Sequence, residues 1–106
     1  MLKRGRKSLE WDRVRAKLVQ VFYRWGITAC EIRLPHDCTR TAFTGFAHPR
    51  KRIDLKEGEI WIVILACTNG HNIIEYELGH QGMYDYVWEI IRDRGVYFDG
   101  KKDVYI

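Results

Sequence analysis

The stretch that decides the fold covers residues 66–75 and reads Ala66-Cys67-Thr68-Asn69-Gly70-His71-Asn72-Ile73-Ile74-Glu75. It follows an apolar run over residues 60–65, so we expect a strand, a tight turn and then a helix. His71 and Glu75 are spaced by four, which on a helix puts both side chains on one face. An imidazole nitrogen and a carboxylate that converge there can hold a divalent cation. The stretch therefore predicts a pair of metal ligands near the start of a helix.

The chain immediately upstream favours two strands. Residues 41–47 are expected to form the first strand, and residues 59–66, which are nearly all apolar, a second and buried one. Pro49 argues against a helix across His48, because the residue before a proline avoids the helical region. With a helix over residues 69–78, the order is strand, loop, strand, helix, which is a ββα unit.

Amphipathic helices are expected on both sides of this unit. Ser8 is a plausible N-cap, and apolar residues recur at helical spacing until Gly26, which predicts a helix over residues 9–25. After residue 78, Gly79 and Gly82 are expected to interrupt the helix. A further helix is expected to begin near Met83 and to end at Gly95.

The last residues favour a small hairpin. Residues 96–98 and 104–106 are apolar and aromatic, and they flank the turn signal Asp99-Gly100. The alternative is an extended tail that pairs with another chain.

Composition indicates one folded domain over residues 1–106, with 46% apolar residues and four tryptophans. The three cysteines cannot all pair, which argues against a disulfide framework. No apolar run is long enough for a membrane span, and no apolar signal core follows the basic start. We therefore expect a cytoplasmic protein.

The net charge is +4, and the positive charge gathers in two blocks. Each block is either a solvated segment or a set of phosphate contacts, and their position beside the candidate metal ligands favours phosphate contacts. The first block is Lys3, Arg4, Arg6 and Lys7, and the second is Arg50, Lys51 and Arg52.

Several motifs together resemble the HNH (ββα-metal) endonucleases, and most of all the small members that phages carry. The motifs are Cys30-Glu31-Ile32-Arg33-Leu34, then Cys38-Thr39, then a strand that ends at a histidine, then a strand that enters Cys67-x-x-x-His71. The resemblance covers residues 23–78. It implies an α+β fold with a ββα-metal core, flanked here by the N-terminal helix and by a C-terminal helix with its short hairpin.

The resemblance also implies roles for individual residues. His48 lies where the family has its general base, and His71 and Glu75 lie where the family holds its divalent metal. That metal would be Mg or Mn, with Zn or Ni as alternatives. The implied activity is that of an endonuclease or nickase on DNA, with the two basic blocks on phosphates. If the chain is phage-encoded, it would act in the bacterial host cell, where other phage or host proteins are further candidate partners.

This chain departs from the family pattern at three places. Gly70 stands where the second knuckle has its second cysteine, so Cys30, Cys38 and Cys67 either hold a structural zinc or pack as reduced, apolar side chains. His36 could supply a fourth ligand or, like His80, lie on the surface. Ala47 stands where many members have a metal ligand, and Asp54 is the candidate substitute.

The third departure is that residues 49–66 contain no asparagine, although the family has one in this loop. These departures leave two further readings open. One is an eroded module that binds DNA or a phage or host protein without cleaving. The other is a structural or inhibitory phage protein whose three cysteines belong to the core.

Overall fold

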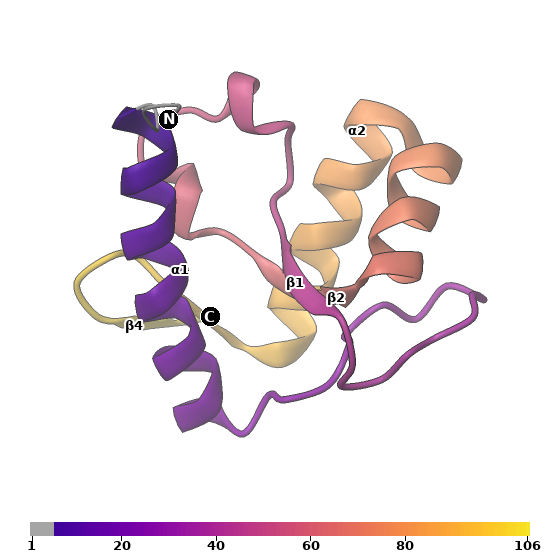
Figure 1. Ribbon diagram of the computed structural model, residues 1–106, viewed down its shortest axis with the longest axis horizontal. Coiled ribbons are helices and arrows are strands. Elements are labelled where there is room, and N and C mark those ends of the chain that lie inside the picture. The colour runs from indigo at the N-terminus through magenta and orange to yellow at the C-terminus, as the bar shows by residue number, and fades with distance from the viewer. Residues whose placement is uncertain (1–5) are drawn as a thin grey trace, which may run out of the picture.

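The structure is a computed structural model that describes residues 6–106, and of residues 6–9 and 52 it describes the backbone alone. It is an α+β domain with two helices and two small antiparallel sheets (Figure 1). In chain order, the elements are α1 (Arg6–Trp25), β1 (Thr44–Ala47), the short 3-10 turns η1 (Arg52–Asp54) and η2 (Glu59–Trp61), β2 (Ile64–Cys67), α2 (Thr68–Arg94), β3 (Val96–Phe98) and β4 (Asp103–Tyr105).

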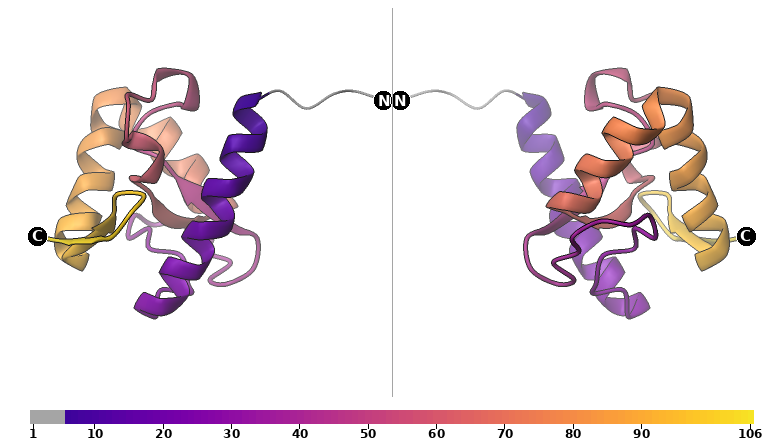
Figure 2. Two further views of the ribbon diagram at one scale, coloured as in Figure 1. Left: turned by 90° about the vertical axis from the view of Figure 1, so that its left-hand side faces the viewer. Right: turned by 90° about the vertical axis from the view of Figure 1, so that its right-hand side faces the viewer.

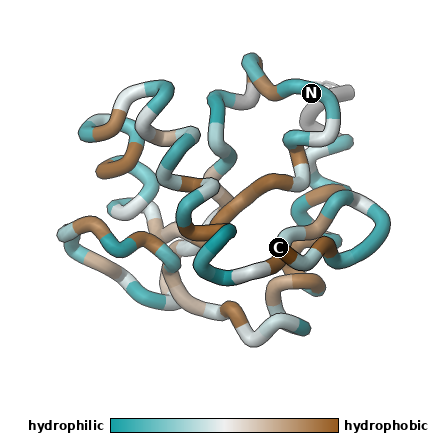
Figure 3. The backbone as a smooth tube through the Cα atoms, turned by 180° about the vertical axis from the view of Figure 1, so that it is seen from behind, coloured by the Kyte–Doolittle hydropathy of each residue, from teal (hydrophilic) through white to brown (hydrophobic). Residues whose placement is uncertain are grey.

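The sheet of β1 and β2 lies between the two helices (Figures 1 and 2). The strands are antiparallel, with Thr44 opposite Cys67 and Ala47 opposite Ile64. Successive residues of β2 pack on opposite faces of the sheet, with Ile64 in the hydrophobic cluster beside α2 and Leu65 in the cluster beside α1. Every residue of β2 is buried, which confirms that this strand is covered on both faces. In Figure 3 the apolar run that leads into β2 crosses the middle of the molecule.

Helix α1 closes one side of the sheet through Val14, Leu18 and Phe22, which are all buried. The predicted stop at Gly26 is confirmed, because this glycine has a φ of 78° directly after the last helical residue. The predicted start is wrong. The helix begins at Arg6 rather than residue 9, so Ser8 lies inside it and is not its cap. Arg6 and Lys7 are both good helix formers and extend the first turn.

Helix α2 consists of two helical segments that meet at a sharp break, as the sequence predicted. The break is at Gly79, whose φ of 68° and ψ of −173° are not helical, whereas Gly82 lies within the helix. The expectation that both glycines interrupt the chain is therefore only half right. The predicted end at Gly95 is confirmed, since its φ is 84° and its N–H donates to the Ile91 carbonyl.

Both central strands are shorter than predicted. β1 begins at Thr44 instead of residue 41. Residues Glu59–Trp61 form the turn η2, so β2 begins only at Ile64. The side chain of Glu59 explains this turn, because its Oε1 accepts from the backbone N of Lys56 at 2.7 Å and holds the chain in a bend.

The C-terminal hairpin forms within the chain, with Val96 opposite Tyr105 and Phe98 opposite Asp103. Hydrogen bonds from the backbone N–H groups of Lys102 and Lys101 to Asp99 hold the turn and lower the pKa of its carboxyl group. Asp103 joins the hairpin to the end of α1, since its carboxylate lies 2.6 Å from Arg24 and 3.1 Å from the Trp25 indole N–H. In the part of the chain that is described, no helix is long and apolar enough to cross a membrane.

Candidate functional site

A cavity of about 350 Å³ opens where β1 ends and faces the first half of α2. Three of the residues that the sequence singled out, His48, His71 and Glu75, line this one cavity. Residues of α1, β1, the following loop and α2 complete the wall, namely Trp11, Phe46, Arg50, Lys51 and Met83. The strand pairing ends at Ala47 opposite Ile64, and His48, which follows directly, shares the cavity with the pair on α2.

His48 is held in one orientation. It follows the last residue of β1 and is only 7% exposed. Its Nε2 lies 3.1 Å from the carbonyl oxygen of Ile60, and its ring centroid lies 4.9 Å from that of Trp11. A carbonyl accepts but does not donate, so Nε2 carries the hydrogen and Nδ1 is the basic nitrogen of the ring. In this tautomer Nδ1 is the ring nitrogen that can accept a proton.

His71 and Glu75 form a close pair on α2. Nε2 of His71 lies 3.3 Å from Oε1 of Glu75, and both side chains are a little under half exposed. Neighbouring ligands of an octahedral Mg or Mn ion, each about 2.1 Å from the metal, are about 3 Å apart. The pair thus has the separation of two adjacent ligand positions. Among the described residues, no third His, Cys, Asp or Glu joins them in a compact set.

Two residues of the second basic block line the cavity. The Nε of Arg50 is 3.2 Å from the Glu59 carboxylate, and its guanidinium lies over the Tyr84 ring at 4.5 Å. Lys51 is exposed. The side chains of Arg52, Arg6 and Lys7, and the residues Lys3 and Arg4 altogether, lie outside what the structure describes.

Neither Ala47, at the position where the resemblance expects a metal ligand, nor its suggested substitute Asp54 contributes to this site. Ala47 is fully buried in the core beneath α2. Asp54 is exposed in η1 and is not among the residues that line the cavity. The pair on α2 is therefore the whole set of metal ligands that the described side chains offer here.

A second cluster gathers Cys30, His36, Cys38 and Cys67, whose ligand atoms all lie within 4.8 Å of one another. Cys67 ends β2, and the other three residues come from the irregular segment between α1 and β1. In a tetrahedral zinc site with Zn–S distances of about 2.3 Å, neighbouring sulfurs are about 3.8 Å apart. The cluster thus needs only a small contraction to hold a metal ion such as zinc.

His36 completes this cluster, although the sequence left it between ligand and surface residue. Its Nδ1 is 2.6 Å from the Leu34 carbonyl oxygen, and its Nε2 is 3.8 Å from Sγ of Cys30. Because the carbonyl fixes the hydrogen on Nδ1, the lone pair of Nε2 faces the thiols, as in many metal-bound histidines. The spacing His36-x-Cys38 was the signal in the sequence that could have favoured the ligand role.

The missing cysteine at position 70 has a structural explanation. A Cβ at Gly70 would lie 3.1 Å from Nε2 of His36 and 2.9 Å from Cγ1 of Ile32. His36 therefore occupies the space that a side chain at position 70 would need. At this point His36 from the loop, and no side chain at position 70, lies among the three thiols.

The thiols of the cluster differ in acidity. Burial raises the pKa of Cys67, but hydrogen bonds from the backbone of Thr39 and Gly70 and from the Cys30 thiol outweigh it and lower the pKa to about 6. Burial raises the pKa of Cys30. Of these two thiols, Cys67 has the lower pKa, and the thiolate is the form that binds metals.

Comparison with known proteins adds nothing to this geometry, since no family model, no curated protein and no solved structure matches the chain. The inferences about function therefore depend on the residues and their arrangement.

Proposed function

We propose that the protein is a metal-dependent endonuclease or nickase of the HNH type that hydrolyses phosphodiester bonds in DNA. One observation carries the proposal: His48, His71 and Glu75, selected by the resemblance from two separate parts of the sequence, line one cavity. The antiparallel pairing of β1 with β2, followed directly by α2, is the order that a ββα-metal core requires.

Each side chain has a defined task in this proposal. Nδ1 of His48 accepts a proton from the attacking water, and the Ile60 carbonyl orients the ring and stabilises the charged imidazolium. His71 and Glu75 hold the divalent ion, which when bound stabilises negative charge on the phosphate and on the leaving oxygen. Lys51, with Arg50 anchored to Glu59, attracts the phosphate backbone.

A plasmid-cleavage assay tests this function. We expect the purified protein to nick plasmid with Mg or Mn, and His48→Ala to lower the rate by about 10²- to 10⁴-fold. Circular dichroism and thermal unfolding of the variant should match the parent. A folded parent that leaves plasmid intact across Mg, Mn, Ni and Zn would contradict the proposal.

The proposal also assigns a structural zinc ion to Cys30, His36, Cys38 and Cys67. It is supported by the exposure of Cys38, because an exposed thiol does not fit the alternative in which the cysteines pack as core residues. We expect about one zinc ion per purified chain, as in other sites with four protein ligands. Metal analysis of the parent and of Cys38→Ser would show whether zinc is present and whether this thiol holds it.

A second candidate function is DNA binding without cleavage. It is favoured by the small ligand set, since Ala47 is buried and only two described side chains can hold the catalytic ion. This function predicts salt-sensitive DNA affinity, no nicking, and no rise in melting temperature on addition of Mg or Mn.

A further inference from the structure

A second cavity, of about 300 Å³, adjoins the first. It is lined by Lys51, Glu75, Tyr76, Gly79, His80 and Met83. Lys51, Glu75 and Met83 line both cavities, so the two form one continuous cleft. His48 lies in the first part of the cleft and His80 in the second. The cleft therefore continues beyond the cavity that holds His48.

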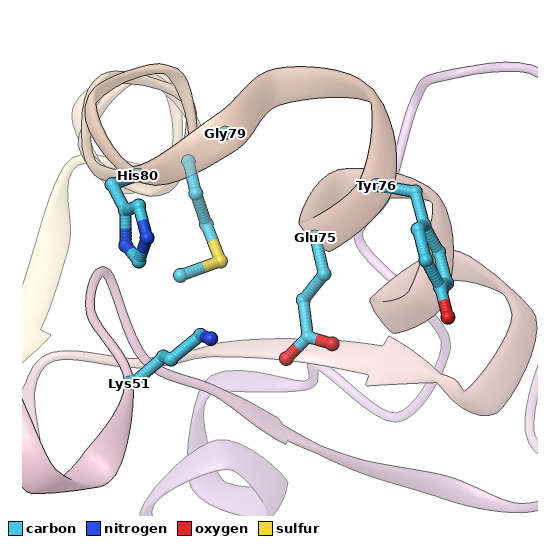
Figure 4. Close-up of a pocket in the computed structure, with 6 residues that line it drawn as sticks. Lys51, Glu75, Tyr76, Gly79 and His80 are labelled. Carbon is cyan, nitrogen blue, oxygen red and sulfur yellow. The ribbon is translucent and has the colours of Figure 1, made fainter.

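The break in α2 shapes this second cavity. Gly79 has a φ of 68° and a ψ of −173°, and the helix resumes in a new direction at His80. Figure 4 shows His80 from the resumed helix on one side of the cavity, with Lys51 on the opposite side and Glu75 entering from the first half of α2. The break thus sets the direction from which His80 reaches this space.

The polar groups of the second cavity suit a phosphate. The ammonium of Lys51 and an N–H of the His80 imidazole are donors, and both side chains are exposed enough to reach a ligand. Glu75 is the one carboxylate in the lining, and it is 3.3 Å from His71. A cation bound by that pair would offset its negative charge, so an anion could lie beside it.

We propose that the second cavity is a subsite for one further phosphate of the DNA strand, adjacent to the phosphate that is cut, with Lys51 and His80 as its ligands. The inference rests on the proposed function, because the neighbouring cavity must hold the phosphate to be cut. The two phosphates together would fix the register of the strand on the protein, as backbone contacts generally do.

DNA affinity measures the subsite without any cleavage. A fluorescent duplex is titrated with the His48→Ala protein and with the same protein carrying Lys51→Ala or His80→Ala, at several salt concentrations. We expect each substitution to weaken binding about three- to tenfold, and Lys51→Ala to reduce the slope of log affinity against log salt by about 1.

Two controls separate a phosphate contact from general effects. Lys101→Ala removes one exposed positive charge from the hairpin, away from both cavities, and should leave the slope unchanged. His80→Lys keeps a donor in the subsite and should bind like the parent, whereas a merely structural role for His80 would not be rescued by lysine. Unchanged affinity and slope in both Lys51→Ala and His80→Ala would overturn the inference. Failure of the proposed function would appear separately, as DNA binding by a wild-type protein that does not cleave.

Discussion

Gly70 is buried in the first turn of α2, and its lack of a side chain leaves room for Ile32 and His36. These two side chains cannot move away from an added methyl group without loss of stability. The Ile32 side chain is buried, and the His36 ring is hydrogen-bonded to the Leu34 carbonyl. At this position a single methyl group changes both the packing of the core and the position of a metal ligand.

We expect Gly70→Ala to lower the free energy of unfolding by about 1–3 kcal/mol, the usual range for overpacking, and to weaken zinc binding as well. Denaturant unfolding measures the first effect, and a competition titration with a zinc chelator measures the second. Gly45→Ala is the matched control, since a Cβ there would meet nothing within 4 Å. Equal stability and equal zinc affinity in the two variants would contradict the role assigned to Gly70.

At the scale of elements, a buried ion pair joins the segment between α1 and β1 to the end of α2. Nη1 of Arg94 lies 2.9 Å from Oε1 of Glu31, and the side chains are only 8% and 12% exposed. The same Oε1 accepts from the backbone N of Leu65 in β2. The guanidinium of Arg94 lies over the ring of Phe22 in α1 at 4.9 Å. One pair of side chains thus touches both helices and the central sheet.

Removing one charge from this pair should lower the free energy of unfolding, because it leaves the other charge buried without an opposite charge beside it. We expect Glu31→Gln to destabilise the protein by about 3–5 kcal/mol, although the amide oxygen can still accept from Leu65. Asp93→Asn is the control, since it breaks the exposed pair with Arg33 and should cost no more than about 1 kcal/mol. Urea denaturation of the two variants measures the free energy of unfolding of each. Similar losses of stability would show that the buried pair contributes no more than the exposed one.

The break at Gly79 gives a second prediction at this scale. Its φ and ψ lie in a region that is open essentially to glycine alone, so we expect Gly79→Ala to lose about 1–3 kcal/mol or to straighten α2. Because a Cβ at Gly79 would meet nothing within 4 Å, any effect must come from the backbone. Histidine NMR signals of His80 would report the straightening, and an unchanged spectrum with unchanged stability would contradict it.

The elements also show what the sequence could and could not predict. The ends at Gly26 and Gly95 and the final hairpin were predictable, because left-handed glycines and the Asp99-Gly100 turn are local signals. The length of β2 was not predictable from the sequence. The turn at Glu59 depends on a hydrogen bond from the backbone N of Lys56, and it interrupts an apolar run whose pattern is typical of a strand. Gly82 was misread as a break because nothing local distinguishes it from Gly79. The place of His36 depends on room left by Gly70, a residue far from it in the chain.

In the whole molecule, the two candidate metal sites share helix α2. Sγ of Cys67 accepts from the backbone N of Gly70 at 3.2 Å and caps the helix, and His71 lies in the turn that follows. The cysteine cluster also joins the long segment between α1 and β1 to this helix start. A zinc ion in the cluster would therefore stabilise the fold and position the candidate metal-binding pair His71 and Glu75.

We expect removal of zinc to lower the melting temperature by about 10 °C or more, because a ligand that binds only the folded state adds its binding free energy to stability. Cleavage should also fall and should not be restored by Mg or Mn alone, since His71 would lose its support at the start of α2. Calorimetry with and without a zinc-selective chelator measures the shift, and re-addition of zinc should reverse it.

Cys38→Ser is the control: it should melt near the chelated parent and respond little to the chelator. A parent that melts at the same temperature after verified loss of zinc would refute the structural role, because a metal that joined the segment between α1 and β1 to the end of β2 could not leave without loosening them.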